Sequence, residues 1–402
     1  MQVTRVERHN ISRGSPLWKE FDDMCFKAKN LYNYANYIQR QRFINGDKIY
    51  KANELDKLIQ NDSPYKELGS QASQKLLKSL ERNWKSFFVS IKDYSKNPNK
   101  YLGKPKLPKY KKKDGRYICE LKNIQFSIEN SYIRFSLKRL NPYSGLIKTG
   151  VIKPLGLRII PQGNNYILEI TYKKEIQEQK EFNNKILGID LGVNNFATLT
   201  NNIGIQPIVI NGKVIKSINQ YYNKIKSTLQ SDLKKRHKKD WSKELQRITT
   251  KRNNKLEYFL HCASKSVIEY CLGLDIHTIV IGLNKTWKQE CKLNKIINQG
   301  FIQLPYDEFI NKIKYKAQNE GIEVIIHEES YTSGCSFLDG ELPIKQNYDK
   351  SRRIYRGLFK SNTGILINSD VNGSYQIIVK AFPEAFVNGI EGVGLHPVRV
   401  NV

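Results

Sequence analysis

The sequence predicts a multidomain α+β protein with three regions. Apolar residues recur at spacings of three and four in residues 15–91, and at a spacing of two between residues 117 and 172. From residue 185 onward, short apolar strands alternate with amphipathic helices. These patterns predict, in chain order, a helical region, an antiparallel β region and an α/β domain. The length of 402 residues suits two or three domains.

The first region is expected to contain two amphipathic helices. Ser15 can cap the first, with Pro16 at its opening position, and apolar residues follow at helical spacing as far as Ala35. The second follows Ser70 and carries a similar stripe to Ile91. We interpret both stripes as surfaces that pack into a core.

A basic segment separates the helices from the β region. Residues 100–113 hold seven lysines and no acid, interleaved with tyrosine and proline. Such a stretch is either a solvated linker or a strap that contacts phosphates, and the charge of the whole chain keeps the strap as a hypothesis. Its candidate nucleic-acid contacts are Lys104, Lys106, Lys109, Tyr110, Lys111, Lys112 and Lys113.

Alternating apolar residues in 117–172, with turn residues at 141–142 and 163–165, predict a small antiparallel barrel or sandwich. A polar linker, 175–184, leads to the last domain. This domain is expected to open with a strand at 185–191 and to carry a basic helical pair in residues 213–255, which hold fourteen Lys and Arg against three acids. The other expected elements are strands at 196–200, 207–210, 276–281 and 322–326 and helices at 306–319 and 370–382.

The charge of the chain points to a polyanionic partner. Sixty-seven Lys and Arg against 38 Asp and Glu give a net charge of +29, which nucleic acid would neutralise with release of counterions. No stretch approaches the roughly 18 apolar residues of a spanning helix, and the start has no apolar signal-peptide core. We therefore expect a cytoplasmic protein with no membrane partner. The six cysteines form no CxxC pair, so we expect reduced, mostly buried thiols and no zinc.

Four acids are candidates for chemistry. The strand order of the last domain is the one expected of an RNase H-like fold, with Asp190 on its first strand and Asp370 at the start of its final helix. An acid at a helix start is also common because of the helix dipole. Glu328 and Glu329 follow the strand at 322–326. Two-metal phosphodiester hydrolysis needs clustered oxygen ligands, so Asp190, Asp370 and one of these glutamates could hold the ions. If the strand runs on through both glutamates, alternation directs only one of them toward Asp190.

Three motifs resemble the TnpB family, transposon-encoded RNA-guided nucleases ancestral to type V CRISPR effectors. They are Gly-Ile-Asp-Leu-Gly-Val-Asn-Asn at 188–195, Tyr-Thr-Ser-x-Cys-Ser at 331–336 and Asp-Val-Asn at 370–372. Their order and separation match over about residues 185–381. The N-terminal half resembles the family more loosely, through Asn-Leu-Tyr-Asn at 30–33 and the basic strap.

The resemblance implies a domain plan and partners. Residues 1–13 and 100–182 would form a β-barrel wedge domain, with a helical recognition domain at 14–99 inserted in it, followed by a RuvC-like nuclease domain at 183–402. A guide RNA from the transposon end would direct cutting of double-stranded DNA beside a short flanking motif. Asp190 and Asp370 would be ligands of two Mg²⁺ ions. We expect a prokaryotic, nucleoid-associated protein and favour a monomer, although the sequence does not fix the oligomeric state.

Two departures from the family pattern matter. Gly282 stands at the strand end where most relatives carry the catalytic glutamate, so either the nuclease is dead or the acid has moved to Glu328 or Glu329. We favour relocation, because Asp190 and Asp370 remain. The usual zinc ribbon keeps only Cys335, which predicts a shortened, metal-free insert at about 330–368 that touches nucleic acid through Arg352, Arg353 and Arg356.

Three functions are therefore in competition. The first is an RNA-guided, Mg²⁺-dependent DNA endonuclease. The second is a guided DNA-binding protein or repressor without cleavage, which rests on Gly282. The third is a transposase or resolvase that needs no guide. In the first two, the basic helical pair would contact RNA or heteroduplex phosphates through Lys234, Lys235, Arg236, Lys238 and Lys239.

Overall fold

The computed structural model describes residues 2–179, 181–284, 304–355 and 357–387, together with 389, 392 and 394–402. Contacts within this part of the chain divide it into two compact units, Gln2–Glu175 and Ile176–Val402. Each unit combines helices with strands and buries apolar clusters of its own. The prediction of a multidomain protein of mixed α and β structure is confirmed.

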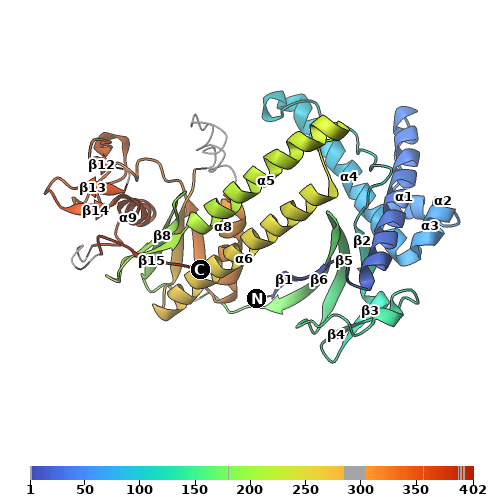
Figure 1. Ribbon diagram of the computed structural model, residues 1–402, viewed down its shortest axis with the longest axis horizontal. Helices are drawn as coiled ribbons and strands as arrows, with labels where there is room; N and C mark the ends of the chain where they lie inside the picture. Colours follow the sequence, from blue (N-terminus) through green and yellow to red (C-terminus); the bar gives the residue numbers. More distant parts are fainter. Residues whose placement is uncertain are drawn as a thin grey trace. The chain divides into compact units, whose positions relative to one another are not determined.

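The first unit is an antiparallel sheet with helices inserted after its first strand (Figure 1). Strand β1 (Gln2–Ile11) pairs along its whole length with β6 (Asn165–Glu175). The order of the sheet is β1-β6-β5-β2, where β5 is Pro154–Gln162 and β2 is Cys119–Lys122. The inserted helices are α1 (Leu17–Ile44), α2 (Ala52–Ile59), α3 (Ser63–Leu68) and α4 (Ser70–Lys96).

The closed barrel expected for this unit is not shown. Among the described residues, the edge strands β1 and β2 do not pair with each other, so the sheet is open. Strands β3 (Phe126–Glu129) and β4 (Tyr132–Phe135) form a separate hairpin. Residues 136–153 contain turns and a short 3₁₀ segment, with one isolated bridge between Tyr132 and Lys148, so no ladder joins the hairpin to the sheet.

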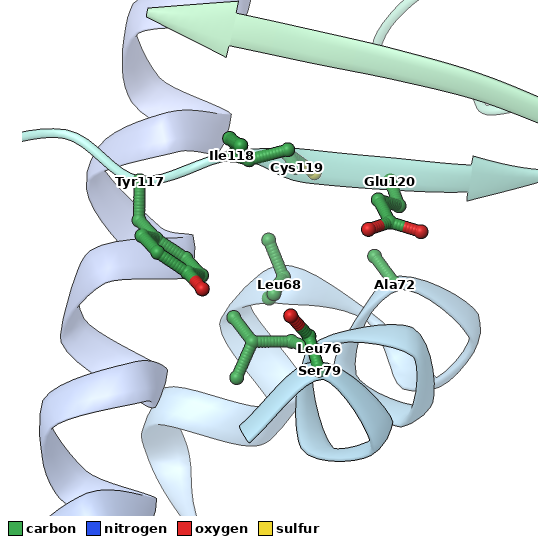
Figure 2. A pocket seen from close by; sticks show the side chains of 8 residues that line it. All are labelled: Leu68, Ala72, Leu76, Ser79, Tyr117, Ile118, Cys119 and Glu120. Atoms are coloured by element: carbon green, nitrogen blue, oxygen red, sulfur yellow. The ribbon is translucent and has the colours of Figure 1, made fainter. Parts of the chain in front are cut away.

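The long helices follow the predicted apolar stripes. On α1 the residues from Leu17 to Ala35 that recur at helical spacing are buried, and on α4 Trp84 is fully buried and donates its indole N–H to Asn36. The expected Ser15 cap is wrong by one position, because Pro16 is the N-cap and α1 begins at Leu17. Between α4 and β2 lies a cavity of about 30 Å³ (Figure 2). Its volume suits one or two waters and no larger ligand.

The second unit is built on a six-stranded sheet of order β11-β10-β7-β8-β9-β15. Strands β7, β8 and β9 form an antiparallel meander, and β10 and β11 continue the sheet parallel to β7. The strands are β7 (Ile186–Leu191), β8 (Asn195–Asn201), β9 (Ile208–Asn211), β10 (Thr278–Gly282), β11 (Glu323–His327) and β15 (Val398–Val400).

Helices cover both faces of this sheet (Figure 1). Leu187, Ile189 and Leu191 of β7 pack with α6 (Lys243–Gly273) and α8 (Tyr306–Asn319). The alternate residue Ile186 packs with α9 (Ser369–Ala381) on the other face. Strand alternation therefore places Asp190 on the α9 face. Helix α5 (Lys213–His237) runs antiparallel to α6 as a long helical hairpin.

The insert before α9 is a folded element. Strands β12 (Arg353–Tyr355), β13 (Leu358–Lys360) and β14 (Leu366–Asn368) form a small antiparallel sheet. Its inner residues Phe359 and Ile367 pack with Phe337 and with Tyr375 of α9. Within the described part of the chain, no helix is long and apolar enough to cross a membrane.

Candidate active site

Asp190 lies where β7 comes closest to α9. Gly188 allows the approach, because a Cβ there would come within 2.5 Å of the Ser374 carbonyl oxygen on α9. Gly373 leaves room for the carboxylate itself, since a Cβ on Gly373 would lie 3.0 Å from Asp190 Oδ2. Two glycines, one on the strand and one on the helix, therefore seat Asp190 against the first turns of α9.

Asp370 stands on the same side of α9. It is three residues before Gly373, so the two positions share a helix face. The N-cap residue Asn368 fixes the helix start, accepting the backbone N–H groups of Asp370 at 3.0 Å and Val371 at 3.2 Å. Asn195, at the start of β8, donates to Asp370 Oδ2 at 2.6 Å. The Asp370 carboxylate is thus held by a residue of the neighbouring strand.

The two glutamates after β11 point to different surroundings. Glu328 is exposed and forms an ion pair with Lys380 at 2.8 Å, and it also accepts the Ser330 hydroxyl at 2.6 Å. Glu329 turns inward, where its Oε1 accepts a hydrogen bond from Asn284 at 3.4 Å. β11 ends at His327, so the two side chains diverge in the turn after the strand. Glu329 is the glutamate on the Asp190 side, since its charge acts on Asp190.

Glu329 occupies the space in front of Gly282. Strands β10 and β11 are parallel neighbours, and Gly282 pairs with His327, two residues before Glu329. A Cβ on Gly282 would lie 2.8 Å from Glu329 Oε2 and 2.4 Å from Ile377 Cδ1. A carboxylate from beyond the end of β11 therefore lies in front of the end of β10, where this chain has Gly282.

The charges of these acids act on each other. Burial raises the pKa of Asp190 well above its usual value, the charges of Asp370 and Glu329 raise it further, and Arg353 lowers it. Burial, with the charge of Glu328, raises the pKa of Glu329 to about 7, against the opposing effect of Lys380. The hydrogen bonds from Lys380 and Ser330 lower the pKa of Glu328. Asp190 and Glu329 thus sit in surroundings that oppose their ionised forms, as sites that bind cations do.

The chemistry of the donor set fits Mg²⁺, which takes hard oxygen ligands. Asp190, Asp370 and Glu329 each offer a carboxylate, and mutual repulsion raises the pKa of Asp190. The three carboxylates do not converge on a single point. Among the described residues, no group of three or more His, Cys, Asp or Glu is placed to hold a metal ion. Asp370 is engaged by Asn195 instead.

Three residues of the site received no role from the sequence. Asn195 and Asn372 lie inside the motifs that carried the resemblance, and Gly373 follows one of them. Asn372 donates to the Cys335 carbonyl oxygen at 2.8 Å and accepts the Phe337 N–H at 3.0 Å, so it ties the root of the insert to α9. The signal that the sequence offered for them was an amide side chain inside a motif.

The chain is similar to known proteins over much of its length. Residues 169–288 match the family described as OrfB_IS605, "Probable transposase", and residues 306–377 match the "Cas12f1-like, TNB domain". The "TnpB-like protein ORF457" of Acidianus two-tailed virus is 24% identical over 391 residues, covering 88% of this chain and 81% of that protein. The chain is similar to TnpB-family proteins. The resemblance drawn from the three motifs is confirmed.

Two solved structures are similar to this chain along most of its length. "Cryo-EM structure of the Cas12f1-sgRNA-target DNA complex" has a TM-score of 0.38 at 16% identity, covering 93% of this chain and 98% of that one. "Structure of the mini-RNA-guided endonuclease CRISPR-Cas_phi3" has a TM-score of 0.48 at 11% identity, covering 94% and 92%.

The basic strap lies along α1. Asn33 binds both backbone groups of Lys111, at 2.8 and 3.0 Å, and Lys29 donates to the Lys113 carbonyl oxygen at 2.7 Å. Lys111 turns inward, with its ammonium group 4.6 Å from the Tyr32 ring, so it is the strap lysine that is least available to a phosphate. The remaining candidates are exposed: Lys104, Lys106, Lys109, Tyr110, Lys112 and Lys113.

The basic hairpin and the insert present their cations differently. The five candidates at the hairpin turn, Lys234, Lys235, Arg236, Lys238 and Lys239, are all exposed. In the insert, Arg353 is exposed, whereas Arg352 forms two bonds to Glu341, at 2.7 and 2.8 Å, and lies 4.0 Å from Asp339. Arg352 is therefore a structural residue of the insert rather than a free contact. Arg356 lies outside the described residues.

Proposed function

We propose that this protein is an RNA-guided DNA endonuclease encoded by a transposon. In this proposal it uses a guide RNA to select double-stranded DNA and hydrolyses phosphodiesters at Asp190, Glu329 and Asp370. The observation that carries the proposal is Glu329 in front of Gly282, because it restores a third acid at the strand end where the family usually has one. The similarity to TnpB-family proteins and the net charge of +29 support nucleic-acid partners.

The chain's own residues have separable parts in this reaction. Asp190 and Asp370 offer oxygens from β7 and α9, and Glu329 offers a third from beyond β11. With two Mg²⁺ ions bound, such a set activates water and stabilises the leaving oxygen. Asn195 orients Asp370, and the Gly188–Gly373 contact keeps Asp190 beside α9. Arg353, whose charge acts on Asp190, can also attract the phosphate of the strand to be cut.

In this proposal, Glu328 takes no part in the reaction. Its carboxylate is taken by Lys380 and Ser330, and Lys380 also donates to the Ser330 carbonyl oxygen at 2.9 Å. These bonds hold the turn that follows β11. Glu328 therefore positions the segment that carries Glu329 and does not itself supply a ligand.

The wider domain plan is part of the proposal. Residues 1–13, 14–99 and 100–182 would hold the guide RNA, residues 183–402 would cut, and the insert at about 330–368 would contact the target. Helices inserted between β1 and β2, and a strap fixed along α1, support this division. The exposed lysines of the strap are its proposed phosphate contacts.

The second candidate is a guided DNA-binding protein without cleavage. It is favoured by Gly282, which cannot ligate a metal, and by carboxylates that are not gathered around one point in the described residues. The third candidate, a transposase that needs no guide, has only the family description "Probable transposase" in its favour. RNA that co-purifies with the chain separates it from the first two.

The test is cleavage by the protein purified with its RNA. Duplexes that match the guide, with randomised flanking sequence, are offered with Mg²⁺ or with a chelator, to the native chain and to Asp190→Asn. We expect defined cuts only with Mg²⁺ and native protein, and unchanged target binding by the variant. Bound but intact targets under every metal condition would establish the guided binder instead. Undiminished cutting by Asp190→Asn would refute the site.

A further inference from the structure

A second basic feature of the first unit lies on the helices, away from the strap. An open groove of about 460 Å³ runs between the start of α2 and the middle of α4, with β2 at its side. Its volume is in the range of sites that hold a small ligand or a piece of a polymer. It is lined by Lys51, Ala52, Asn53, Lys75, Lys78, Glu81, Arg82 and Glu120.

Three cations of the groove have no bonding partner among the described residues. Lys75, Lys78 and Arg82 occur at helical spacings of three and four, so they share one face of α4. Their side chains form no hydrogen bond or ion pair with any residue that the structure describes, whereas the nearby Lys85 is paired with Glu81 at 2.8 Å. Three unpaired cations on one face of a helix repel each other, and a polyanion lying in the groove would relieve that repulsion.

The groove also contains two carboxylates, which a site for bare phosphate would avoid. Glu81 is fixed in place, because it pairs with Lys85 and accepts the Ala52 N–H at 3.3 Å. Glu120 projects from β2 toward α4 beside Ala72, and its carboxylate has no bonding partner among the described residues (Figure 2). An ionised carboxylate only accepts hydrogen bonds. The groove therefore suits a ligand that carries hydroxyl donors as well as phosphates.

We propose that this groove binds the ribose-phosphate backbone of an RNA strand. Lys75, Lys78 and Arg82 contact successive phosphates, and Glu120 accepts a hydrogen bond from a ribose 2′-hydroxyl. That hydroxyl is the group by which a protein distinguishes RNA from DNA. The strap and the hairpin turn present mainly exposed cations, which add affinity, whereas the groove, with Glu120 beside its cations, adds selectivity.

The inference rests on the proposed function only for the identity of the RNA, which in the cell would be the guide. The test therefore measures binding in a chelator, without cleavage. The probes are a single-stranded RNA and the DNA of the same sequence, titrated against the full chain and read by fluorescence anisotropy. The variant is the triple substitution Lys75→Gln, Lys78→Gln and Arg82→Gln.

A matched control removes three charges from the same unit outside the groove, as Lys48→Gln, Lys57→Gln and Lys66→Gln, all at exposed residues. We expect the groove variant to bind RNA about tenfold more weakly than the control, with the slope of log K against log salt reduced by about 2. The loss for DNA should be clearly smaller. If the groove variant lost no more RNA affinity than the control, the groove would not be an RNA-binding site. If it lost affinity for RNA and for DNA equally, the groove would not be specific for RNA.

Glu120→Ala separates selectivity from affinity. Because it removes a negative charge, it should leave DNA binding equal or stronger while the ratio of RNA to DNA affinity falls toward one. An unchanged ratio would contradict the role of Glu120 and, with it, the RNA assignment. If the native complex fails to cut DNA with Mg²⁺ while these binding results hold, the endonuclease proposal fails and the groove stands.

Discussion

At the residue scale, the candidate site depends on positions without side chains as much as on its acids. Gly188 and Gly373 let β7 and α9 approach, and Gly282 leaves the space that Glu329 fills. A methyl group at any of the three positions would push against a backbone or side-chain atom that shapes the site. The geometry of the carboxylates is thus set by close packing, which tolerates little added volume.

Gly373→Ala is predicted to reduce cleavage by about tenfold or more, because its Cβ would push on Asp190 Oδ2 from 3.0 Å and small displacements in a site are costly. The fold should persist, since alanine favours a helix over glycine. The measurement is the single-turnover cutting rate beside thermal unfolding. Gly273→Ala is the control, as a Cβ there meets nothing within 4 Å. Equal rates for the two variants would contradict the placement of Asp190.

The sequence could predict which acids were candidates, but not the choice between the glutamates. Alternation would make Glu328 and Glu329 diverge if the strand continued through them; the structure ends β11 at His327, and the two side chains diverge in the turn that follows. What decides the direction is Lys380 on α9, 51 residues after Glu329 in the chain, and the space at Gly282 on another strand. Neither contact is local in sequence, so no periodicity could reveal it.

At the element scale, the insert holds its shape through a cluster of ionic bonds. Arg352 bonds Glu341 at 2.7 Å and lies 3.8 Å from Asp349. Glu341 also accepts the Ser336 N–H at 2.8 Å, and its carbonyl oxygen accepts from Gln376 of α9 at 2.9 Å. One guanidinium thus joins the segments that surround the β12–β14 sheet.

Arg352→Gln is therefore predicted to loosen the insert while the rest of the second unit stays folded. It leaves Asp339 and Glu341, which are 8% and 16% exposed, without the guanidinium that they contact, at a cost of about 1–3 kcal/mol. Hydrogen exchange of residues 336–362 should accelerate. Lys350→Gln removes the same charge from an exposed neighbour and should leave exchange unchanged. Similar exchange in both variants would show that the cluster has no structural role.

Elements were predictable where the apolar pattern extended over enough residues to show its period. Helix α8 has the predicted bounds of 306–319, and the meander β7–β8–β9 is within a residue or two of its prediction. The short helices α2 and α3, with 8 and 6 residues, were missed because they complete too few turns to show a period. The edge strand β15 was missed because its three residues are defined only by pairing with β9.

At the scale of the whole molecule, the chain carries a net charge of +29, and several separate surfaces present its cations. The strap is fixed along α1, the groove lies between α2 and α4, and the hairpin turn exposes five cations without a shape that would read bases. A rigid helical hairpin with exposed lysines suits phosphates of any sequence.

Neutralising Lys234, Lys235, Arg236, Lys238 and Lys239 to glutamine is predicted to weaken RNA binding for every guide sequence alike. Counterion release implies that the slope of log K against log salt falls by up to about 3.5 for these five charges. Binding isotherms at four salt concentrations, with two unrelated RNAs, provide the measurement. An unchanged slope, or a loss confined to one RNA, would contradict the phosphate role.

The barrel shows the limit of prediction at this scale. Period-two patterning gives the strands and their inward faces, and Leu157, Ile159 and Leu168 are buried as it predicts. Whether such a sheet closes depends on pairing between β1 and β2, whose sequences are more than a hundred residues apart. The alternation of each strand is the same in an open sheet and in a closed one, so the pattern cannot predict whether the sheet closes.

The most direct test of the central claim compares cleavage by Glu329→Gln and Glu328→Gln, each purified with its RNA and supplied with matched duplex and Mg²⁺. Both substitutions remove one charge from adjacent residues, but only Glu329 fills the space before Gly282. The account predicts that Glu329→Gln binds its target and leaves it uncut, while Glu328→Gln cuts within a few-fold of the native rate. Full activity in Glu329→Gln, or its loss in Glu328→Gln alone, would contradict the relocated glutamate.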